Sequence, residues 1–126
     1  MELWDAYNKN EEKVGVDLVR GEAIPKGLYA LAVSTVVRHK DGTYLLMKRD
    51  ESKTIAPGFE EVGAGGAVRK GETPRQAAYR ELWEETGIKA TRLDPIFHLI
   101  SEGTQGIYYG YLCLTDIPKD SIVLQA

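Results

Sequence analysis

The chain has 126 residues, of which 43% are hydrophobic and 28% charged, with a formal net charge of −3. This length suits a single domain with its own core, and the net acidity argues against a general nucleic-acid-binding surface. The single cysteine, Cys113, excludes an internal disulfide and a cysteine-based zinc site. No apolar run approaches the roughly 20 residues of a membrane helix, and the acidic opening does not resemble a signal peptide, so we expect a cytoplasmic protein.

The first part of the chain predicts a hairpin and then a long strand. Glu2 to Tyr7 and Val14 to Arg20 are strand candidates on either side of the polar turn Asn8 to Lys13. Gly21 to Gly27 is a connector. Leu28 to Arg38 is rich in β-branched residues, which indicates a buried strand.

The middle of the chain predicts a turn, a strand and a loop. Asp41-Gly42 is a hairpin turn signal that leads into a strand at Thr43 to Arg49. Asp50 to Gly58 is expected to be a loop. Glu60 to Val68 predicts a short strand followed by a glycine loop, Gly63-Ala64-Gly65-Gly66, whose bare backbone can approach a ligand closely.

One helix is predicted, from about Thr73 to Thr86. Thr73 can serve as its N-cap, Pro74 suits the first helical position, and Gln76 completes a capping box. Gly87 is placed to end the helix in a left-handed cap.

Two strand candidates follow the helix, Thr91 to Ser101 and Gly106 to Thr115, joined by the turn Glu102-Gly103. Strands therefore flank a single helix along the chain. This order predicts a fold of the α/β (α+β) type, with a mixed sheet.

Three carboxylates lie within five residues near the end of the predicted helix, at Glu81, Glu84 and Glu85. Residues at i, i+3 and i+4 share one helix face. Like charges held this close repel one another unless a cation lies among them. A hard divalent metal is the natural occupant, because carboxylate oxygens suit Mg²⁺ and Mn²⁺.

The segment from Gly66 to Ile88 resembles the signature of the Nudix hydrolases, G-x5-E-x7-R-E-U-x-E-E-x-G-U, in which U is apolar. Every fixed place is filled without a gap or substitution. The matching residues are Gly66, Glu72, Arg80, Glu81, Leu82, Glu84, Glu85, Gly87 and Ile88. The resemblance implies a single Nudix domain over residues 1–126, with an N-terminal hairpin and connector at 1–27 and the Nudix core at 28–126.

The Nudix fold that this resemblance implies is an α/β/α sandwich. Members usually continue into a second long helix on the opposite face of the sheet, and we expect that C-terminal helix layer to be missing from this chain. A sheet face left bare would expose a large apolar patch. A truncated sequence, a naturally short member, or a subunit whose partner covers the face would each explain this, and we favour truncation or an oligomer such as a homodimer.

The resemblance also implies the reaction and the residues that carry it out. Nudix enzymes cleave a diphosphate linkage in nucleoside diphosphate derivatives, with Mg²⁺ or Mn²⁺ activating a water molecule. The expected metal ligands are Glu81, Glu84, Glu85 and the carbonyl of Gly66, and the expected catalytic residues are the same three glutamates with Arg80. The expected partner is a small-molecule diphosphate, with neither a membrane nor a nucleic-acid polymer.

Individual roles within this set follow from the same match. We expect Glu84 to act as the general base. Arg80 is expected to pair with a glutamate such as Glu72 and to orient the carboxylates. Glu61, just before the glycine loop, is a further candidate near the metal.

Other interpretations remain open for several residues. Lys48 and Arg49 are candidates for binding substrate phosphate, although a solvated surface explains them equally well. The three helix glutamates could form an ordinary solvated helix face, but their fixed spacing within the motif argues against this.

Two alternatives compete with the hydrolase interpretation. The residues before the helix also resemble a Nudix branch akin to isopentenyl diphosphate isomerase, which uses a cysteine and a histidine before the motif. The segment Glu61 to Gly66 contains neither residue, which argues against isomerisation. A non-catalytic nucleotide-binding Nudix module is the second alternative, although binding alone does not need three metal-binding glutamates.

Overall fold

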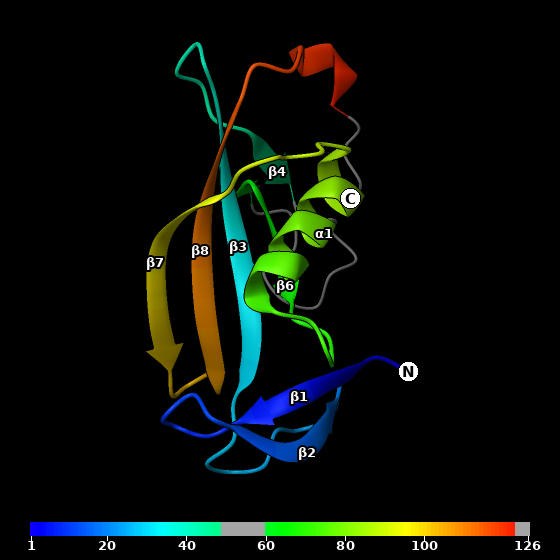
Figure 1. Ribbon diagram of the computed structural model, residues 1–126, viewed down its shortest axis with the longest axis vertical. Coiled ribbons are helices and arrows are strands. Elements are labelled where there is room, and N and C mark those ends of the chain that lie inside the picture. Colours follow the sequence, from blue (N-terminus) through cyan, green and yellow to red (C-terminus); the bar gives the residue numbers. More distant parts are fainter. Residues whose placement is uncertain (49–59, 123–126) are drawn as a thin grey trace.

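A mixed β-sheet with an α-helix on one face forms the body of the protein (Figure 1). The computed structural model describes residues 1–48 and 60–122. Its elements are β1 Leu3–Tyr7, β2 Lys13–Val19, β3 Ala30–His39, β4 Leu46–Lys48, β5 Glu60–Val62, β6 Ala64–Ala67, α1 Pro74–Thr86, β7 Asp94–Ser101, β8 Gly106–Thr115 and the short 3-10 helix η1 Lys119–Ser121. Within those two ranges, no helix is long and apolar enough to cross a membrane.

The main sheet has the strand order β6-β3-β8-β7. Its two central strands, β3 and β8, run parallel, with Leu31 opposite Ile107 and Thr35 opposite Tyr111. Each outer strand pairs antiparallel with its central neighbour. The predicted mixed sheet is therefore confirmed.

The N-terminal hairpin forms as predicted, with β1 and β2 antiparallel and a bulge between Asp5 and Tyr7. The side-chain oxygen of Asn8 closes the turn by accepting hydrogen bonds from the backbone N–H groups of Asn10 and Glu12. Reciprocal backbone hydrogen bonds of 2.9 and 2.8 Å between Tyr7 and Tyr29 join the hairpin to the start of the main sheet.

The predicted glycine loop is wrong, because this segment is strand β6. Gly65 lies opposite Ser34 and Gly66 opposite Val33 in the antiparallel pairing with β3. A Cβ atom on Gly65 would lie 2.6 Å from the carbonyl oxygen of Val33. Glycine at this position therefore allows two strands to approach each other closely. Composition alone does not distinguish this role from that of glycine in a flexible loop.

The strand predicted at Thr43 to Arg49 is shorter in the structure, where β4 covers Leu46–Lys48. It pairs antiparallel with β5 in a separate two-stranded sheet. The segment just before β4 is linked to β3 by an isolated bridge between Arg38 and Tyr44 and by the backbone hydrogen bond from Leu45 to Val37. The predicted loop from Asp50 to Gly58 lies outside the described residues.

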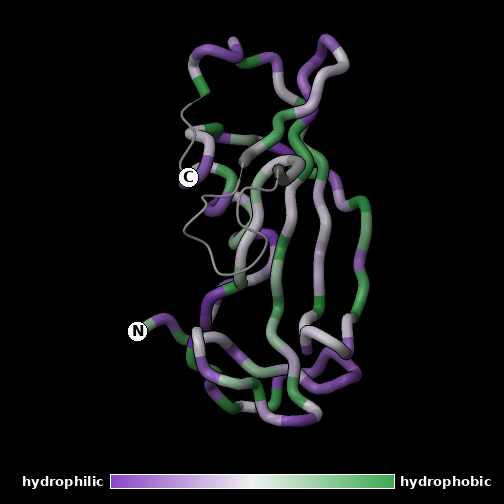
Figure 2. Tube along the Cα trace, turned by 180° about the vertical axis from the view of Figure 1, so that it is seen from behind, coloured by the Kyte–Doolittle hydropathy of each residue, from purple (hydrophilic) through white to green (hydrophobic). Residues whose placement is uncertain are grey.

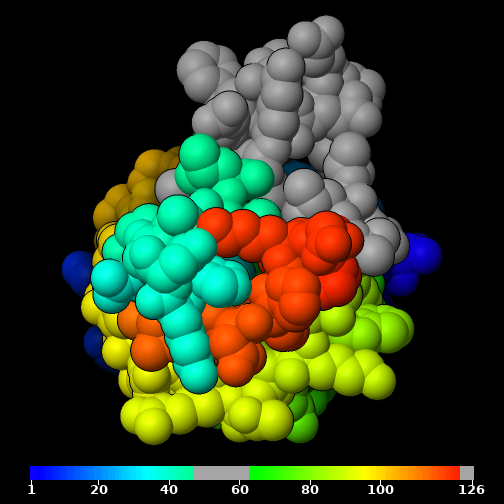
Figure 3. All heavy atoms as spheres, turned by 90° about the horizontal axis from the view of Figure 1, so that it is seen from above, coloured from blue at the N-terminus to red at the C-terminus, as the bar shows by residue number. Residues whose placement is uncertain are grey.

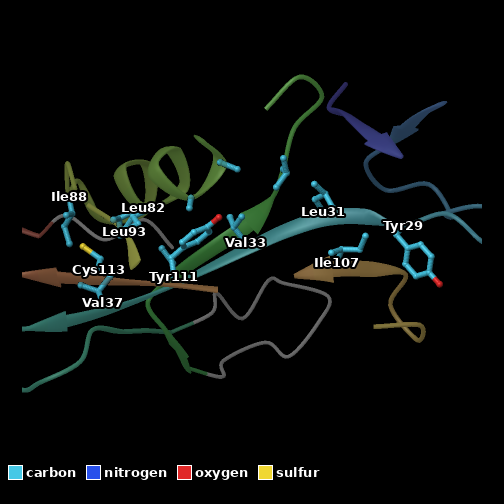
Figure 4. Close-up of a cluster of buried hydrophobic side chains, with 14 residues drawn as sticks. Tyr29, Leu31, Val33, Val37, Leu82, Ile88, Leu93, Ile107, Tyr111 and Cys113 are labelled. Atoms are coloured by element: carbon cyan, nitrogen blue, oxygen red, sulfur yellow. The ribbon is translucent and has the colours of Figure 1, made fainter. Parts of the chain in front are cut away.

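The main hydrophobic core lies between α1 and the face of the sheet that α1 covers (Figure 4). The helix contributes Ala77, Ala78 and Leu82, whose side chains are fully buried. The sheet contributes alternate residues of β3 and β8, which include Val33, Val37, Ile107, Tyr111 and Cys113. Burial of this one helix face holds α1 against the sheet. The polar side of α1, which carries the glutamates, is thereby kept beside β6.

The opposite face of the sheet is apolar and exposed, and no helix of the described residues covers it (Figure 2). Phe97, Leu99 and Leu114 are 40%, 49% and 56% exposed. Phe97 lies over Gly110, where a Cβ atom would meet its ring. An exposed apolar patch is what we expected of a sheet face without a helix layer.

A pocket of about 260 Å³ lies at one end of the sheet, between the β3–β4 turn and η1 (Figure 3). The ion pair between Lys119 and Asp41, at 2.6 Å, joins these two segments. The pocket is lined by Val37, His39, Thr43, Tyr44, Leu45, Thr115, Lys119 and Ile122. None of the predicted site residues whose side chains the structure describes lines it.

Candidate functional site

Helix α1 begins and ends at the residues that the sequence predicts. The hydroxyl of Thr73 accepts from the backbone N–H of Gln76 at 3.1 Å, and the Gln76 side chain accepts from the N–H of Thr73 at 2.9 Å. At the other end, Gly87 adopts φ 76°, and its N–H donates to the carbonyl of Trp83. The capping box and the left-handed cap are therefore both formed, and they set the register of the glutamates that follow.

Arg80 is the centre of the hydrogen-bond network on the polar side of α1. Its Nε and Nη2 donate to the two carboxylate oxygens of Glu72 at 2.6 and 2.9 Å. Nη2 also donates to the carbonyl of Ala67 at 3.1 Å. Nη1 donates to Glu81 at 2.7 Å and to Glu84 at 3.3 Å. An arginine has five N–H donors, so this network engages all of them.

The electrostatics of the network follow from this arrangement. Burial alone would raise the pKa of Glu72, but hydrogen bonds from Arg80 and from the backbone N–H of Arg69 outweigh it and lower that pKa. Bonding to Glu72 in turn raises the pKa of Arg80 above its ordinary value. Both groups are therefore charged near neutral pH, and the pair joins the middle of α1 to the segment that leads into the helix.

The carboxylate of Glu81 rests on the bare backbone of β6. A Cβ atom built on Gly66 would lie 2.6 Å from Cδ of Glu81, closer than any real contact of that kind. Glu85, on the same side of the helix, accepts from the backbone N–H of Gly65 at 3.3 Å. The two glycines of β6 thus bring the strand close enough to meet two of the three helix glutamates.

The three glutamates do not form the single bare acidic patch that the sequence predicts. Arg80 lies between Glu81 and Glu84, and its cation compensates their charge. Among the side chains that the structure describes, those of residues 1–46 and 63–122, no group of three His, Cys, Asp or Glu side chains is close enough to hold a metal ion as it stands. The helical spacing was predicted correctly, but the position of Arg80 depends on its tertiary contacts with Glu72 and Ala67.

The residues present nevertheless fit a small divalent cation of the Mg²⁺ type. The donors gathered where α1 meets β6 are hard oxygens, the carboxylates of Glu81, Glu84 and Glu85, beside the backbone of Gly66. Because Gly66 lacks a side chain, the Glu81 carboxylate lies directly against the backbone of β6. The Glu84 side chain is 39% exposed, so this edge of the cluster opens to solvent.

Three other predicted site residues lie outside the helix. Lys48 is the last residue of β4, and Glu61 lies in β5 opposite Met47. Arg49 lies outside the described residues, as do the side chains of Lys48 and Glu61.

Sequence reasoning missed two residues that contact this network, Arg69 and Glu2. Arg69 Nη1 lies 4.0 Å from the carboxylate of Glu84, and its Nε donates to Glu2 at 3.2 Å. Arg69 occupies a variable place in the motif, so its type carries no signal there. Glu2 lies at the opposite end of the chain, and only the tertiary fold brings it to the site.

Comparisons with known proteins show the family to which the motif belongs. The NUDIX domain family model matches residues 28–122. An uncharacterized Nudix hydrolase of Listeria monocytogenes is 39% identical over 88 residues, which are 70% of this chain and 52% of that protein. An RNA pyrophosphohydrolase of Cereibacter sphaeroides is 38% identical over 66 residues, which are 52% of this chain and 38% of that protein.

A similar structure has been solved by crystallography. DR0079 from Deinococcus radiodurans superposes with a TM-score of 0.78 at 25% sequence identity, over 98% of this chain and 76% of that one. The chain spans about half the length of the curated Listeria relative that it matches. With the family model covering most of its length and the complete motif lying where α1 meets β6, this chain belongs to the Nudix family.

Proposed function

We propose that this protein hydrolyses a diphosphate linkage in a nucleoside diphosphate derivative, with Mg²⁺ or Mn²⁺ as the metal. The observation that supports this most strongly is the set of motif glutamates, of which Glu81 and Glu85 meet the glycine strand β6 while Arg80, fully engaged, donates to Glu81 and Glu84. Membership of the Nudix family and the similarity to a pyrophosphohydrolase point to the same reaction class.

The carboxylates would hold the cation, and the arginine would keep them in place. Glu81, Glu84 and Glu85 are the ligands in this proposal, with the carbonyl of Gly66. A divalent cation held there supplies charge neutralisation at the phosphate and makes an attacking water more acidic. Arg80 stays on Glu72 and orients the carboxylates from behind.

Glu84 is the proton acceptor in this proposal. Its side chain is 39% exposed, against 16% for Glu81, so a water molecule reaches it more easily. The water oxygen forms a bond to one phosphorus, and the bridging P–O bond breaks. The water proton passes to Glu84, and the second phosphate leaves with the electron pair of the broken bond.

A substrate panel in labelled water tests this proposal. The protein is incubated with nucleoside diphosphate derivatives, ADP-ribose among them, and Mg²⁺ in H2¹⁸O, and the products are analysed by mass spectrometry. We expect one ¹⁸O atom in one of the two phosphate products. Turnover that leaves both products unlabelled, or that is unchanged by a chelator, would contradict metal-dependent attack by water.

A further inference from the structure

Arg80, the arginine of the motif, has no N–H group left for a substrate. Its five donors are engaged by Glu72, Glu81, Glu84 and the carbonyl of Ala67. A diphosphate that approached this side chain would have to replace one of these bonds. A cationic side chain that binds the substrate must therefore be supplied by another residue.

Arg69 is placed for this task at the open edge of the glutamate cluster. Its side chain is 46% exposed, and Nη1 lies 4.0 Å from a carboxylate oxygen of Glu84. Nε is engaged by Glu2. Among the described residues, neither Nη1 nor Nη2 of Arg69 makes a hydrogen bond. The planar end of this guanidinium thus keeps donors of the kind that bind two phosphate oxygens at once.

The N-terminal hairpin fixes the position of Arg69. Glu2 accepts from Nε of Arg69, and its own carboxylate is held by Nε1 of Trp4 at 2.7 Å. The backbone N–H of Lys70 donates to the carbonyl of Leu3 at 2.8 Å. Next to it, the N–H of Gly71 donates to the carboxylate of Asp5 at 2.9 Å. The segment that carries Arg69 is therefore attached to the hairpin through the Arg69 side chain and through the two residues that follow it.

We propose that Arg69 binds the diphosphate of the substrate and that Glu2 is a positioning residue that aims its guanidinium. This inference rests on the proposed function, since it assigns a substrate-binding residue to the same site. It makes the N-terminal hairpin, which lies outside the matched family region 28–122, part of the active site.

The test compares Arg69→Ala with Arg20→Ala as a matched control. Arg20 also contacts Glu2, at 3.5 Å, but the structure shows no contact between it and Glu84. Each variant is measured in two ways: the KM and kcat for the best substrate of the panel, and the affinity for methylene diphosphonate in the presence of Mg²⁺, by calorimetry. The affinity for Mn²⁺ alone is measured as a third quantity.

We expect Arg69→Ala to raise KM and to weaken diphosphonate binding by about tenfold, which is the worth of one charge-assisted contact. The Mn²⁺ affinity of Arg69→Ala, and all measured quantities of Arg20→Ala, stay within about twofold of the wild type, because these changes remove neither a metal ligand nor, in Arg20→Ala, a phosphate contact. Arg69→Lys recovers part of the loss, because it keeps the charge but not the paired donors. Glu2→Gln raises KM by less and leaves kcat unchanged.

Two results would overturn this inference: an Arg69→Ala variant that binds diphosphonate like the wild type, or equal losses in Arg69→Ala and Arg20→Ala. A parallel loss of Mn²⁺ affinity in Arg69→Ala would also overturn it, because the residue would then support the metal ligands instead. A wild-type protein that binds the diphosphonate through Arg69 but hydrolyses no substrate would contradict the proposed function alone. Failure to bind any diphosphate would contradict both.

Discussion

The backbone of Gly66 lies directly against the carboxylate of Glu81, so closely that a Cβ atom would come within 2.6 Å of it. The neighbouring Gly65 is equally restricted, but by the carbonyl oxygen of Val33 on the paired strand. One glycine thus makes room for a candidate ligand and the other for the sheet. Alanine variants of the two glycines should therefore distinguish an effect on the candidate metal site from an effect on the stability of the fold.

Gly66→Ala is expected to impair the site while the protein stays folded. The new methyl group displaces the end of a flexible side chain, so the free energy of unfolding changes by less than about 1 kcal/mol. Divalent metal binding weakens by about 10- to 100-fold, the usual cost of misplacing a ligand. Calorimetric titration with Mn²⁺ measures this effect.

Gly65→Ala is the companion experiment, and its expected result is different. Its methyl group meets backbone atoms, which cannot move aside, so we expect the free energy of unfolding to fall by about 1 to 3 kcal/mol. Urea denaturation measures both variants. Equal destabilisation by the two substitutions would contradict the assignment of Gly66 to the site.

Lysine should not be able to take over the role of Arg80. In Arg80→Lys, one ammonium group cannot reach Glu72, Glu81, Glu84 and Ala67 together. Loss of the paired donors leaves partly buried acceptors unsatisfied and costs about 1 to 3 kcal/mol of stability. We expect hydrolysis to fall at least tenfold, as for other residues that orient metal ligands. Near wild-type activity in Arg80→Lys would show that the carboxylates hold their positions without this network.

The stability of the protein should decrease in acid partly through Glu72. Its pKa in the folded protein lies below the ordinary value of 4.5. The stabilisation is therefore fully present above pH 4.5 and is lost as the pH falls through the lower folded-state value. Glu72→Gln should be less stable than the wild type at pH 7, and this difference should narrow below pH 4.5.

Denaturant unfolding at a series of pH values measures this change. Glu22→Gln is the matched control, because Glu22 is exposed and has no side-chain partner among the described residues. A constant difference between Glu72→Gln and the wild type from pH 7 to pH 3 would argue against the pairing with Arg80.

Tyr109 reports on the contact between the N-terminal hairpin and the sheet. Burial, and then the hydrogen bond to Glu11 at 3.0 Å, raise its pKa to about 12. His98 stacks on the Tyr109 ring and pairs with the same carboxylate at 2.6 Å. We expect the stabilisation from this hydroxyl to be present below pH 10 and to be lost as the pH approaches 12.

Absorbance at alkaline pH measures this titration. The chain has seven tyrosines, so the signal of Tyr109 is obtained by subtracting the titration of Tyr109→Phe from that of the wild type. Glu11→Gln should lower the midpoint of the difference curve towards 10. A wild-type midpoint already near 10 would show that the hairpin contact does not persist in solution.

The sequence alone predicted local structure well. The helix limits depend on Thr73, Gln76 and Gly87, whose capping contacts are made within a few residues. Strands β3, β7 and β8 of the main sheet follow from β-branched residues and alternation, whereas the glycine-rich β6 does not. For the helix and for these three strands the signal lies in neighbouring residues, so the pattern is sufficient to predict each element.

Tertiary contacts explain what the sequence could not predict. The glycines at 65 and 66 serve as turn residues in many sequences, and here their role depends on Val33 and Glu81. The pairing of Arg80 with Glu72 was expected from the family motif, but its hydrogen bond to the carbonyl of Ala67 was not. The contribution of Glu2 depends on packing of the N-terminal hairpin, across 67 positions from Arg69.

The dependence of hydrolysis on both a divalent ion and Glu84 tests the central claim most directly. The initial rate on the best substrate of the panel is measured as Mg²⁺ is titrated, for the wild type, Glu84→Gln and the control Glu22→Gln. In the wild type and in Glu22→Gln, we predict that the rate rises with Mg²⁺ and then saturates. At saturating Mg²⁺, the rate of Glu84→Gln should be lower than that of the wild type by at least about a hundredfold, since a general base usually contributes about 10²- to 10⁴-fold. Equal rates in all three proteins, with or without Mg²⁺, would contradict the account.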